Sequence, residues 1–134
     1  MNRSEVIAFL ATLFPDFVVH DSFIAELSAL IANSGIEKKF FNLLLVRLKF
    51  LSERGPNAIS LKEFELLKDA SNIYSMHLSG SGFNIRILYS FLPDSRAILL
   101  NAFYKRSGKR KTDYSQQIPI AVQRLSDYHG GKLK

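Results

Sequence analysis

The chain has 134 residues and a formal net charge of +6, with 47% hydrophobic residues and no cysteine. This length accommodates one domain, and the lack of cysteine excludes disulfides, thiolate metal sites and cysteine nucleophiles. No apolar run approaches the length of a membrane span, and the N-terminus lacks a secretory signal pattern, so we expect a cytoplasmic protein.

The positive charge is concentrated in the second half of the chain. Residues 1–72 hold eight basic and nine acidic side chains, whereas residues 73–134 hold ten basic and three acidic ones. The centre of the excess is residues 105–111. A local excess of this kind indicates either a polyanionic partner, with nucleic acid as the first candidate, or a solubilising basic surface.

The first third of the chain has the apolar spacing of helices. A short helix is expected to begin at a Ser4 cap and to stop at Pro15. Residues 17–20 form a short β-prone run, typical of an edge strand. A second helix is expected to begin after residues 21–22 and to end at Gly35.

A third helix is predicted before the turn at residues 55–57. Its apolar face consists of Phe40, Phe41, Leu44, Leu48 and Leu51. Residues 59–68 follow, and their apolar spacing fits either one short helix or a loop tethered to the core.

After Ala70 the apolar period changes from that of a helix to that of a strand. Three strands are predicted at residues 73–78, 83–92 and 96–104, and the short, turn-rich segments between them favour an antiparallel meander. A last helix is expected to begin near Ser115.

The last helix is predicted to bury Ile118, Val122 and Leu125 and to hold Pro119 in its first turn. The predicted fold class is therefore α+β, with N-terminal helices packed on a small antiparallel β-sheet and a C-terminal helix. The other face of the sheet, or its cleft with the last helix, is expected to be free for a partner.

Strand parity collects polar residues on that other face. Asn84, Arg86, Leu88 and Ser90 share one face of their strand, and Ser75 and His77 share one face of the preceding strand. The third strand ends at the basic residues Lys105 and Arg106, and Tyr114 follows at the return of the chain. The hypothesis is a single patch made of His77, Arg86, Lys105, Arg106 and Tyr114.

Such a patch combines cations that bind a phosphate with a histidine and a tyrosine that transfer protons or stack on a base. The alternative is a set of unrelated surface residues: Arg86 as solvent-facing cover, His77 as a surface side chain, and Tyr114 as a helix cap. The histidines are scattered without carboxylates at ligand spacing, so neither a metal nor a cofactor is expected.

Four segments carry a family resemblance. They are residues 73–78 (IYSMHL), 83–91 (FNIRILYSF), 100–106 (LNAFYKR) and 121–128 (AVQRLSDY). In order and spacing they resemble the RelE/ParE toxin superfamily, and in particular its HigB-like, phage-related branch. The resemblance implies a RelE-like microbial RNase fold.

The resemblance divides the chain into three parts. Residues 16–130 correspond to a single RelE-like toxin domain, preceded by an extra N-terminal helix at residues 1–15 and followed by a tail at residues 131–134. The extra helix is a candidate for contact with an antitoxin or with a second copy.

The resemblance also implies a function, namely the toxin of a type II toxin–antitoxin system that acts as a ribosome-dependent mRNA endonuclease. Its partners are then a cognate antitoxin of the helix-turn-helix type, in a possible heterotetramer, together with mRNA in the ribosomal A site and ribosomal RNA. A ParE-like inhibitor of gyrase and a non-catalytic basic module that binds RNA or DNA remain as alternatives.

By position, Arg86 matches the family's phosphate-binding strand arginine, and Lys105 and Arg106 match its basic pair. His77 stands where the family has arginine or lysine, and Ser75 replaces a basic residue of some members. Tyr114 matches a tyrosine that stacks on a base. The RNA-binding set is completed by Lys109, Arg110 and Lys111.

Overall fold

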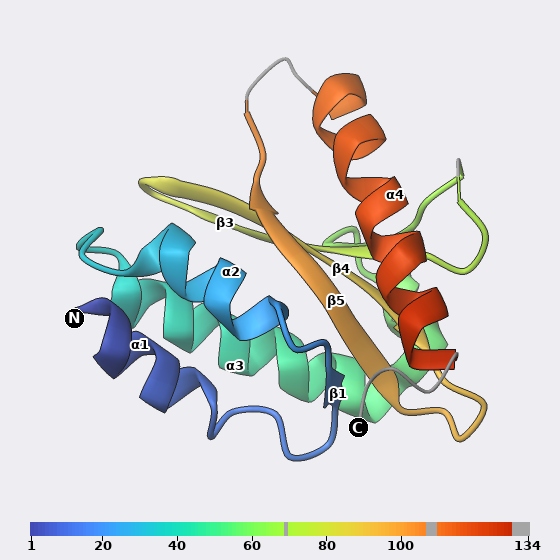
Figure 1. Ribbon diagram of the computed structural model, residues 1–134, viewed down its shortest axis with the longest axis horizontal. Coiled ribbons are helices and arrows are strands. Elements are labelled where there is room, and N and C mark those ends of the chain that lie inside the picture. The colour runs from blue at the N-terminus through green and yellow to red at the C-terminus, as the bar shows by residue number, and fades with distance from the viewer. Residues whose placement is uncertain (69, 107–109, 130–134) are drawn as a thin grey trace.

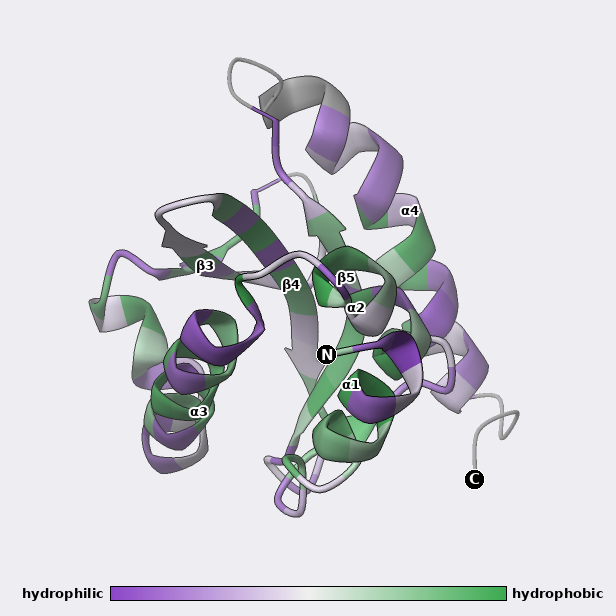
Figure 2. Ribbon diagram, turned by 90° about the vertical axis from the view of Figure 1, so that its left-hand side faces the viewer, coloured by the Kyte–Doolittle hydropathy of each residue, from purple (hydrophilic) through white to green (hydrophobic). Residues whose placement is uncertain are grey.

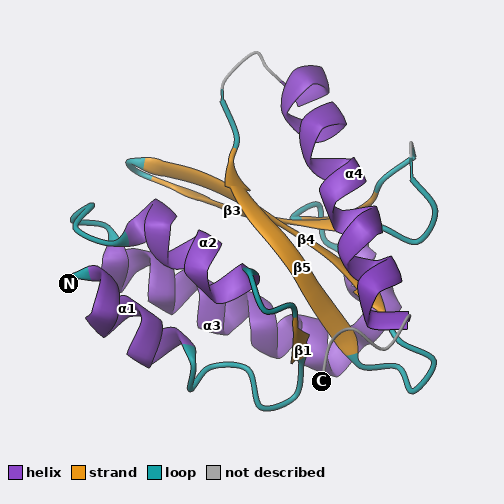
Figure 3. Cartoon of the chain, viewed as in Figure 1, coloured by secondary structure: helices purple, strands orange, loops and turns teal. Residues whose placement is uncertain are grey.

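The computed structural model describes the backbone of residues 1–68, 70–106 and 110–129, and their side chains except those of residues 110–112. Helices lie on both faces of one sheet (Figures 1 and 3). In chain order the elements are α1 (Arg3–Leu10), β1 (Val18–Val19), α2 (Phe23–Ile31), α3 (Glu37–Arg54), the 3₁₀ helix η1 (Gly55–Ser60), β2 (Phe64–Leu66), β3 (Tyr74–Gly80), β4 (Phe83–Phe91), β5 (Ala97–Tyr104) and α4 (Arg110–His129).

The strands are arranged in the order β1-β5-β4-β3-β2. The run from β2 to β5 is an antiparallel meander, which confirms the predicted α+β class. The sheet is mixed, however, because β1 pairs with β5 in parallel, with Val18 opposite Ile98. Residues 17–20 therefore supply the edge strand that their composition predicted.

The main core lies between the sheet and helices α1, α2 and α3. Its fully buried residues include Leu10 of α1, Phe23 of α2 and Phe40 of α3, which pack with Ile87 and Leu99 of the sheet. Burial of this apolar surface is the main stabilising contribution to the fold. Figure 2 shows the matching pattern, with β5 largely hydrophobic and the helices striped by hydropathy.

The predicted face of the third helix is confirmed, since all of its apolar members are buried. Three predicted ends of the first two helices are wrong, and one of them is the stop at Pro15, because α1 already ends at Leu10. Helix α1 is capped by Asn2 rather than Ser4, because the Asn2 side chain accepts from the Glu5 amide and the Glu5 carboxylate accepts from the Asn2 amide. Helix α2 ends at Ile31 rather than at Gly35, and Asn33 (φ 58°) adopts the left-handed conformation just after it.

Residues 59–68 form neither a single short helix nor a simple tether. Their centre is the strand β2, in which Phe64 pairs with Met76 and Glu65 pairs with Ser75 of β3. Phe64 is 2% exposed in the main core, whereas Leu61 is 39% exposed. The spacing of the apolar residues fits a helix, but pairing with the open edge of β3 satisfies backbone groups that a helix of this length leaves free.

Helix α4 packs on the second face of the sheet, so the prediction that this face is free is wrong, whereas the alternative, a partner site at its cleft with the last helix, stays a prediction. It begins at Arg110, so that Pro119 lies inside the helix rather than in its first turn. Val122 is 47% exposed, and Ala121 is the buried residue in its place. A second apolar cluster joins α4 to the sheet; it consists of Leu67, Ile73, Leu88, Leu92, Ile98, Leu100, Phe103, Tyr114 and Ala121.

An ion pair anchors the C-terminal half of α4. Arg124 donates to both carboxylate oxygens of Glu26 in α2, at 2.7 and 2.6 Å, and also to the carbonyl oxygen of Leu100, at 2.8 Å. Glu26 in turn accepts from the amide of Ala102 at 3.3 Å. The pair therefore provides hydrogen-bond partners for backbone groups of β5 that the two-residue strand β1 is too short to reach.

Candidate functional site

The polar residues that share the α4 side of the sheet meet near its β2–β3 edge. Arg86 of β4 lies directly opposite His77 of β3, and Glu65 of β2 lies opposite Ser75 of β3. Directly opposite residues on antiparallel strands point to the same face with neighbouring Cβ atoms. Together with Tyr114 of α4 these four residues form what we call the polar cluster.

Arg86 is the buried cation of the polar cluster. It is 8% exposed, its Nη1 donates to Asn84 Oδ1 at 2.6 Å, and its Nε has no hydrogen-bond partner in the residues that the structure describes. Among the described residues no carboxylate pairs with Arg86. A desolvated guanidinium without a counter-charge is unfavourable by itself, so this arrangement suits the binding of an anion.

Glu65 links the histidine and the tyrosine. Its Oε1 lies 2.9 Å from His77 Nε2 and 3.5 Å from the Tyr114 hydroxyl. The Tyr114 hydroxyl also lies 2.9 Å from Ser75 Oγ. The side chains of His77 and Glu65 are 21% and 30% exposed, so solvent and a substrate reach this part of the polar cluster.

Tyr114 is more buried than its neighbours. It is 6% exposed, and its ring packs edge-on against Phe103 with the ring centroids 5.5 Å apart. The hydroxyl is therefore the part of Tyr114 that reaches the polar cluster.

Asn84 connects Lys105 to the polar cluster. The Asn84 side chain accepts from Arg86 and donates to the carbonyl oxygen of Lys105 at 3.2 Å, and the Lys105 amide donates to the carbonyl oxygen of Asn84 at 2.8 Å. Lys105 Nζ donates to the carbonyl oxygen of Arg106 at 3.3 Å. The end of β5 is thus tied to the strand that carries Arg86.

Arg106 is paired within the chain. Its Nε and Nη2 donate to Asp113 Oδ1 at 3.0 and 2.6 Å, and its amide donates to Asp113 Oδ2 at 2.9 Å. These hydrogen bonds hold the pKa of the Asp113 carboxyl below its usual value. Arg106 consequently joins the end of β5 to the first turn of α4.

The structure thus brings together four residues of the predicted site: Ser75, His77, Arg86 and Tyr114. Lys105 is connected to them through Asn84. Lys109 lies outside the described residues. Arg110 and Lys111 begin α4, and their side chains lie outside the described part of the chain.

Sequence reasoning missed Glu65, Asn84 and Asp113 as members or supports of this site. For Glu65 a signal existed, because Phe64, Glu65 and Leu66 alternate between apolar and polar as a half-buried strand does. No feature of the sequence indicated that Asp113 pairs with Arg106, since this pairing depends on where α4 begins.

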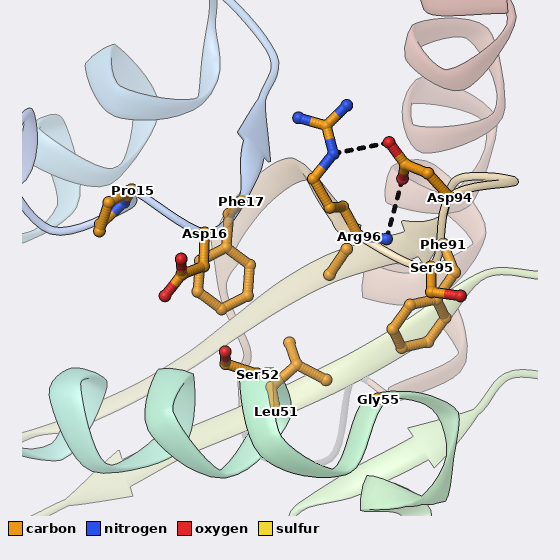
Figure 4. Close-up of a pocket in the computed structure, with 11 residues that line it drawn as sticks. Pro15, Asp16, Phe17, Leu51, Ser52, Gly55, Phe91, Asp94, Ser95 and Arg96 are labelled. Carbon is orange, nitrogen blue, oxygen red and sulfur yellow. Dashed lines mark hydrogen bonds and ion pairs between the residues drawn. The ribbon is translucent and has the colours of Figure 1, made fainter.

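A separate hollow of about 330 Å³ lies at the opposite end of β4 and β5 (Figure 4). It is lined in part by Phe17, Leu51 and the turn residues 94–96. Asp94 accepts from the amide and from Nε of Arg96, at 3.0 and 2.8 Å, and these bonds lower the pKa of its carboxyl. The charge of Arg96 is therefore neutralised by Asp94 at the surface, unlike the charge of the buried Arg86.

The fold and the site define a class of small α+β protein with a buried arginine, paired with no carboxylate of the described residues, on a sheet against which a C-terminal helix packs. Residues 34–126 match the family model described as phage derived protein Gp49-like (DUF891). The chain belongs to this phage-derived family, whose members are in general toxin-like proteins of the RelE/HigB type.

A comparison with curated proteins finds no match. In the residues that the structure describes, no helix combines the length and the apolar character needed to cross a membrane.

Proposed function

We propose that this protein is the toxin of a type II toxin–antitoxin pair and acts as a ribosome-dependent mRNA endonuclease. The observation that carries the proposal is Arg86, a buried guanidinium that pairs with no carboxylate in the described part of the chain and lies directly opposite a histidine. Membership of a family of phage-derived, toxin-like proteins supports the toxin part of the proposal.

The chemistry fits the residues of the polar cluster. RNA carries its own nucleophile, the 2′-hydroxyl, so cleavage requires alignment of that hydroxyl with the phosphorus, removal of its proton and stabilisation of the charged transition state. Arg86 and Lys105 bind the scissile phosphate, and His77 transfers a proton. The products are a 2′,3′-cyclic phosphate and a 5′-hydroxyl, and no metal takes part.

The expected partners follow from this activity. They are mRNA in the ribosomal A site, ribosomal RNA, and a helix-turn-helix antitoxin that forms a heterotetramer with the toxin. A small helix-turn-helix reading frame next to the gene would support the antitoxin part of the proposal.

The test compares Arg86→Ala with Arg96→Ala, a matched loss of one cation at the opposite end of the sheet, where the side chain of Arg96 is 51% exposed. Induction of the unaltered protein is expected to stop growth and to leave cuts with 5′-hydroxyl ends in translated messages, mapped by primer extension. Loss of a preorganised charge at the reacting phosphate is expected to reduce cleavage by roughly 10²- to 10³-fold, whereas Arg96→Ala cleaves normally.

Two results would contradict the proposal. DNA-damage signalling with intact mRNA would indicate a gyrase inhibitor. Steeply salt-dependent RNA binding without cleavage, even with ribosomes present, would indicate a binding module.

A further inference from the structure

Glu65 is the acidic member of the polar cluster, and neither the family resemblance nor the proposed function assigns it a role. Its Oε1 contacts the Nε2 nitrogen of His77 at 2.9 Å. Since a carboxylate only accepts hydrogen bonds, a bond at this distance places a proton on Nε2. In this tautomer of the neutral ring Nδ1 carries no proton, so Nδ1 is the nitrogen that can accept one.

The backbone fixes this geometry from both sides. Glu65 lies in β2 opposite Ser75, two residue pairs away from His77 along β3, and the His77 amide donates to the carbonyl oxygen of Glu63 at 2.8 Å. The carbonyl oxygen of His77 accepts from Arg47 Nε of α3 at 3.2 Å. The histidine backbone is thus held between β2 and α3, while the Glu65 carboxylate orients its ring.

We propose that Glu65 is a positioning residue for His77 in RNA cleavage, a role that rests on the proposed function. Glu65 holds the proton of the neutral ring on Nε2 and stabilises the imidazolium that forms when Nδ1 accepts a second proton, as the aspartate does in a catalytic triad. In this step the 2′-oxygen bonds to phosphorus, its proton moves to Nδ1, and the bond from phosphorus to the 5′-oxygen breaks. The 5′-oxygen takes up one proton from solvent, and His77 later returns its proton to solvent.

A structural role for Glu65 would have a different signature. The two side chains of the pair are 21% and 30% exposed, and ion pairs that exposed contribute little to stability. Glu65→Gln keeps the size and one acceptor oxygen of the side chain but removes its charge. The substitution is therefore expected to leave the fold intact and to change the chemical step.

The experiment measures single-turnover mRNA cleavage on programmed ribosomes, together with the affinity of the full-length protein for those ribosomes. The variants are Glu65→Gln, His77→Gln, the double variant, and the control Glu53→Gln, which removes an exposed carboxylate from α3 on the opposite face of the sheet. Glu65→Gln is expected to lower the cleavage rate by roughly 10²-fold or more and to change the affinity less than twofold. The double variant is expected to be no slower than His77→Gln, because Glu65 acts through His77.

Two outcomes would overturn the inference while leaving the proposed function intact. One is a Glu65→Gln rate within twofold of the Glu53→Gln rate. The other concerns the double variant: adding Glu65→Gln to His77→Gln lowers the cleavage rate by the same factor as Glu65→Gln alone lowers the rate of the unaltered protein. If the unaltered protein cuts no message, the proposed function fails and the catalytic role of Glu65 fails with it.

Nitrogen NMR of the His77 ring tests the geometry separately from activity. The neutral ring is expected to carry its proton on Nε2 in the unaltered protein, and to lose this preference in Glu65→Gln. A neutral ring protonated on Nδ1 in the unaltered protein would refute the inference whatever the protein cleaves.

Discussion

Replacement of Arg124 is expected to loosen α4 from the rest of the fold. The Arg124 side chain is 15% exposed and donates to Glu26 and to the carbonyl oxygen of Leu100. Arg124→Met keeps the aliphatic stem but removes every one of these hydrogen bonds, so the Leu100 carbonyl and the Glu26 carboxylate both lose the guanidinium as a donor.

The size of the effect follows from the geometry. A hydrogen bond to a charged group contributes about 1.5–3 kcal/mol, and solvent screening reduces that figure here because the Glu26 side chain is 31% exposed. We therefore expect Arg124→Met to lower the free energy of unfolding by about 2–3 kcal/mol. For a chain of this size that corresponds to a fall in Tm of about 6–10 °C.

Urea titrations of Arg124→Met, Glu26→Gln and the double variant measure the pairwise coupling, which we expect to be about 1–2 kcal/mol. Arg96→Met is the matched control, because the side chains of Arg96 and Asp94 are about half exposed, at 51% and 53%; its effect is expected to stay within about 0.5 kcal/mol. A coupling energy of zero, or an Arg124→Met effect no larger than that of the control, would refute the assignment of this pair as the anchor of α4.

Three further predictions concern single buried or paired groups. Burial, reinforced by Arg124, lowers the pKa of His20, and its Nδ1 accepts from the Ser22 amide, so folding favours the neutral ring. The free energy of unfolding should fall as pH drops below about 6.5 and level off below the pKa of His20 in the folded protein. Urea titrations of His20→Asn should lack this fall. Asp113→Ala should speed hydrogen exchange of the Arg106 amide by roughly tenfold or more, because that amide donates to the carboxylate; an unchanged exchange rate would refute the link. Burial raises the pKa of Tyr89, whose hydroxyl has no hydrogen-bond partner among the described residues. Tyr89→Phe should therefore leave stability unchanged or raise it by up to about 1 kcal/mol in thermal unfolding, and a clear loss would show that the hydroxyl is bonded.

The meander was predictable from the sequence because alternating residues and short turns are local signals. The same signals placed His77 and Arg86 on one face, which the register confirms. The openness of that face was not predictable, since it depends on where α4 lies. The apolar period of α4 is interrupted by Pro119, and this residue suggested a later start for the helix than the structure shows.

The place of Glu65 in the polar cluster could not be predicted for a related reason. Apolar residues three apart fit both a short helix and a short strand with flanking turns, and only pairing with β3 decides between them. Likewise Asn84 was visible as a polar residue on the correct face, but its hydrogen bonds to Arg86 and Lys105 depend on the register of β5.

The parallel pairing of β1 with β5 sets an order of events during synthesis. Val18 cannot pair before Ile98, its partner 80 positions later, has been made. At about 10 residues per second the time between the synthesis of the two residues is roughly 8 s. Until β5 emerges, α2 lacks the strand on which it packs, and Tyr114 and Arg124 are made later still. The growing chain therefore lacks a complete polar cluster until α4 has left the ribosome that makes it, so under the proposed function the nascent chain is not yet able to cleave mRNA.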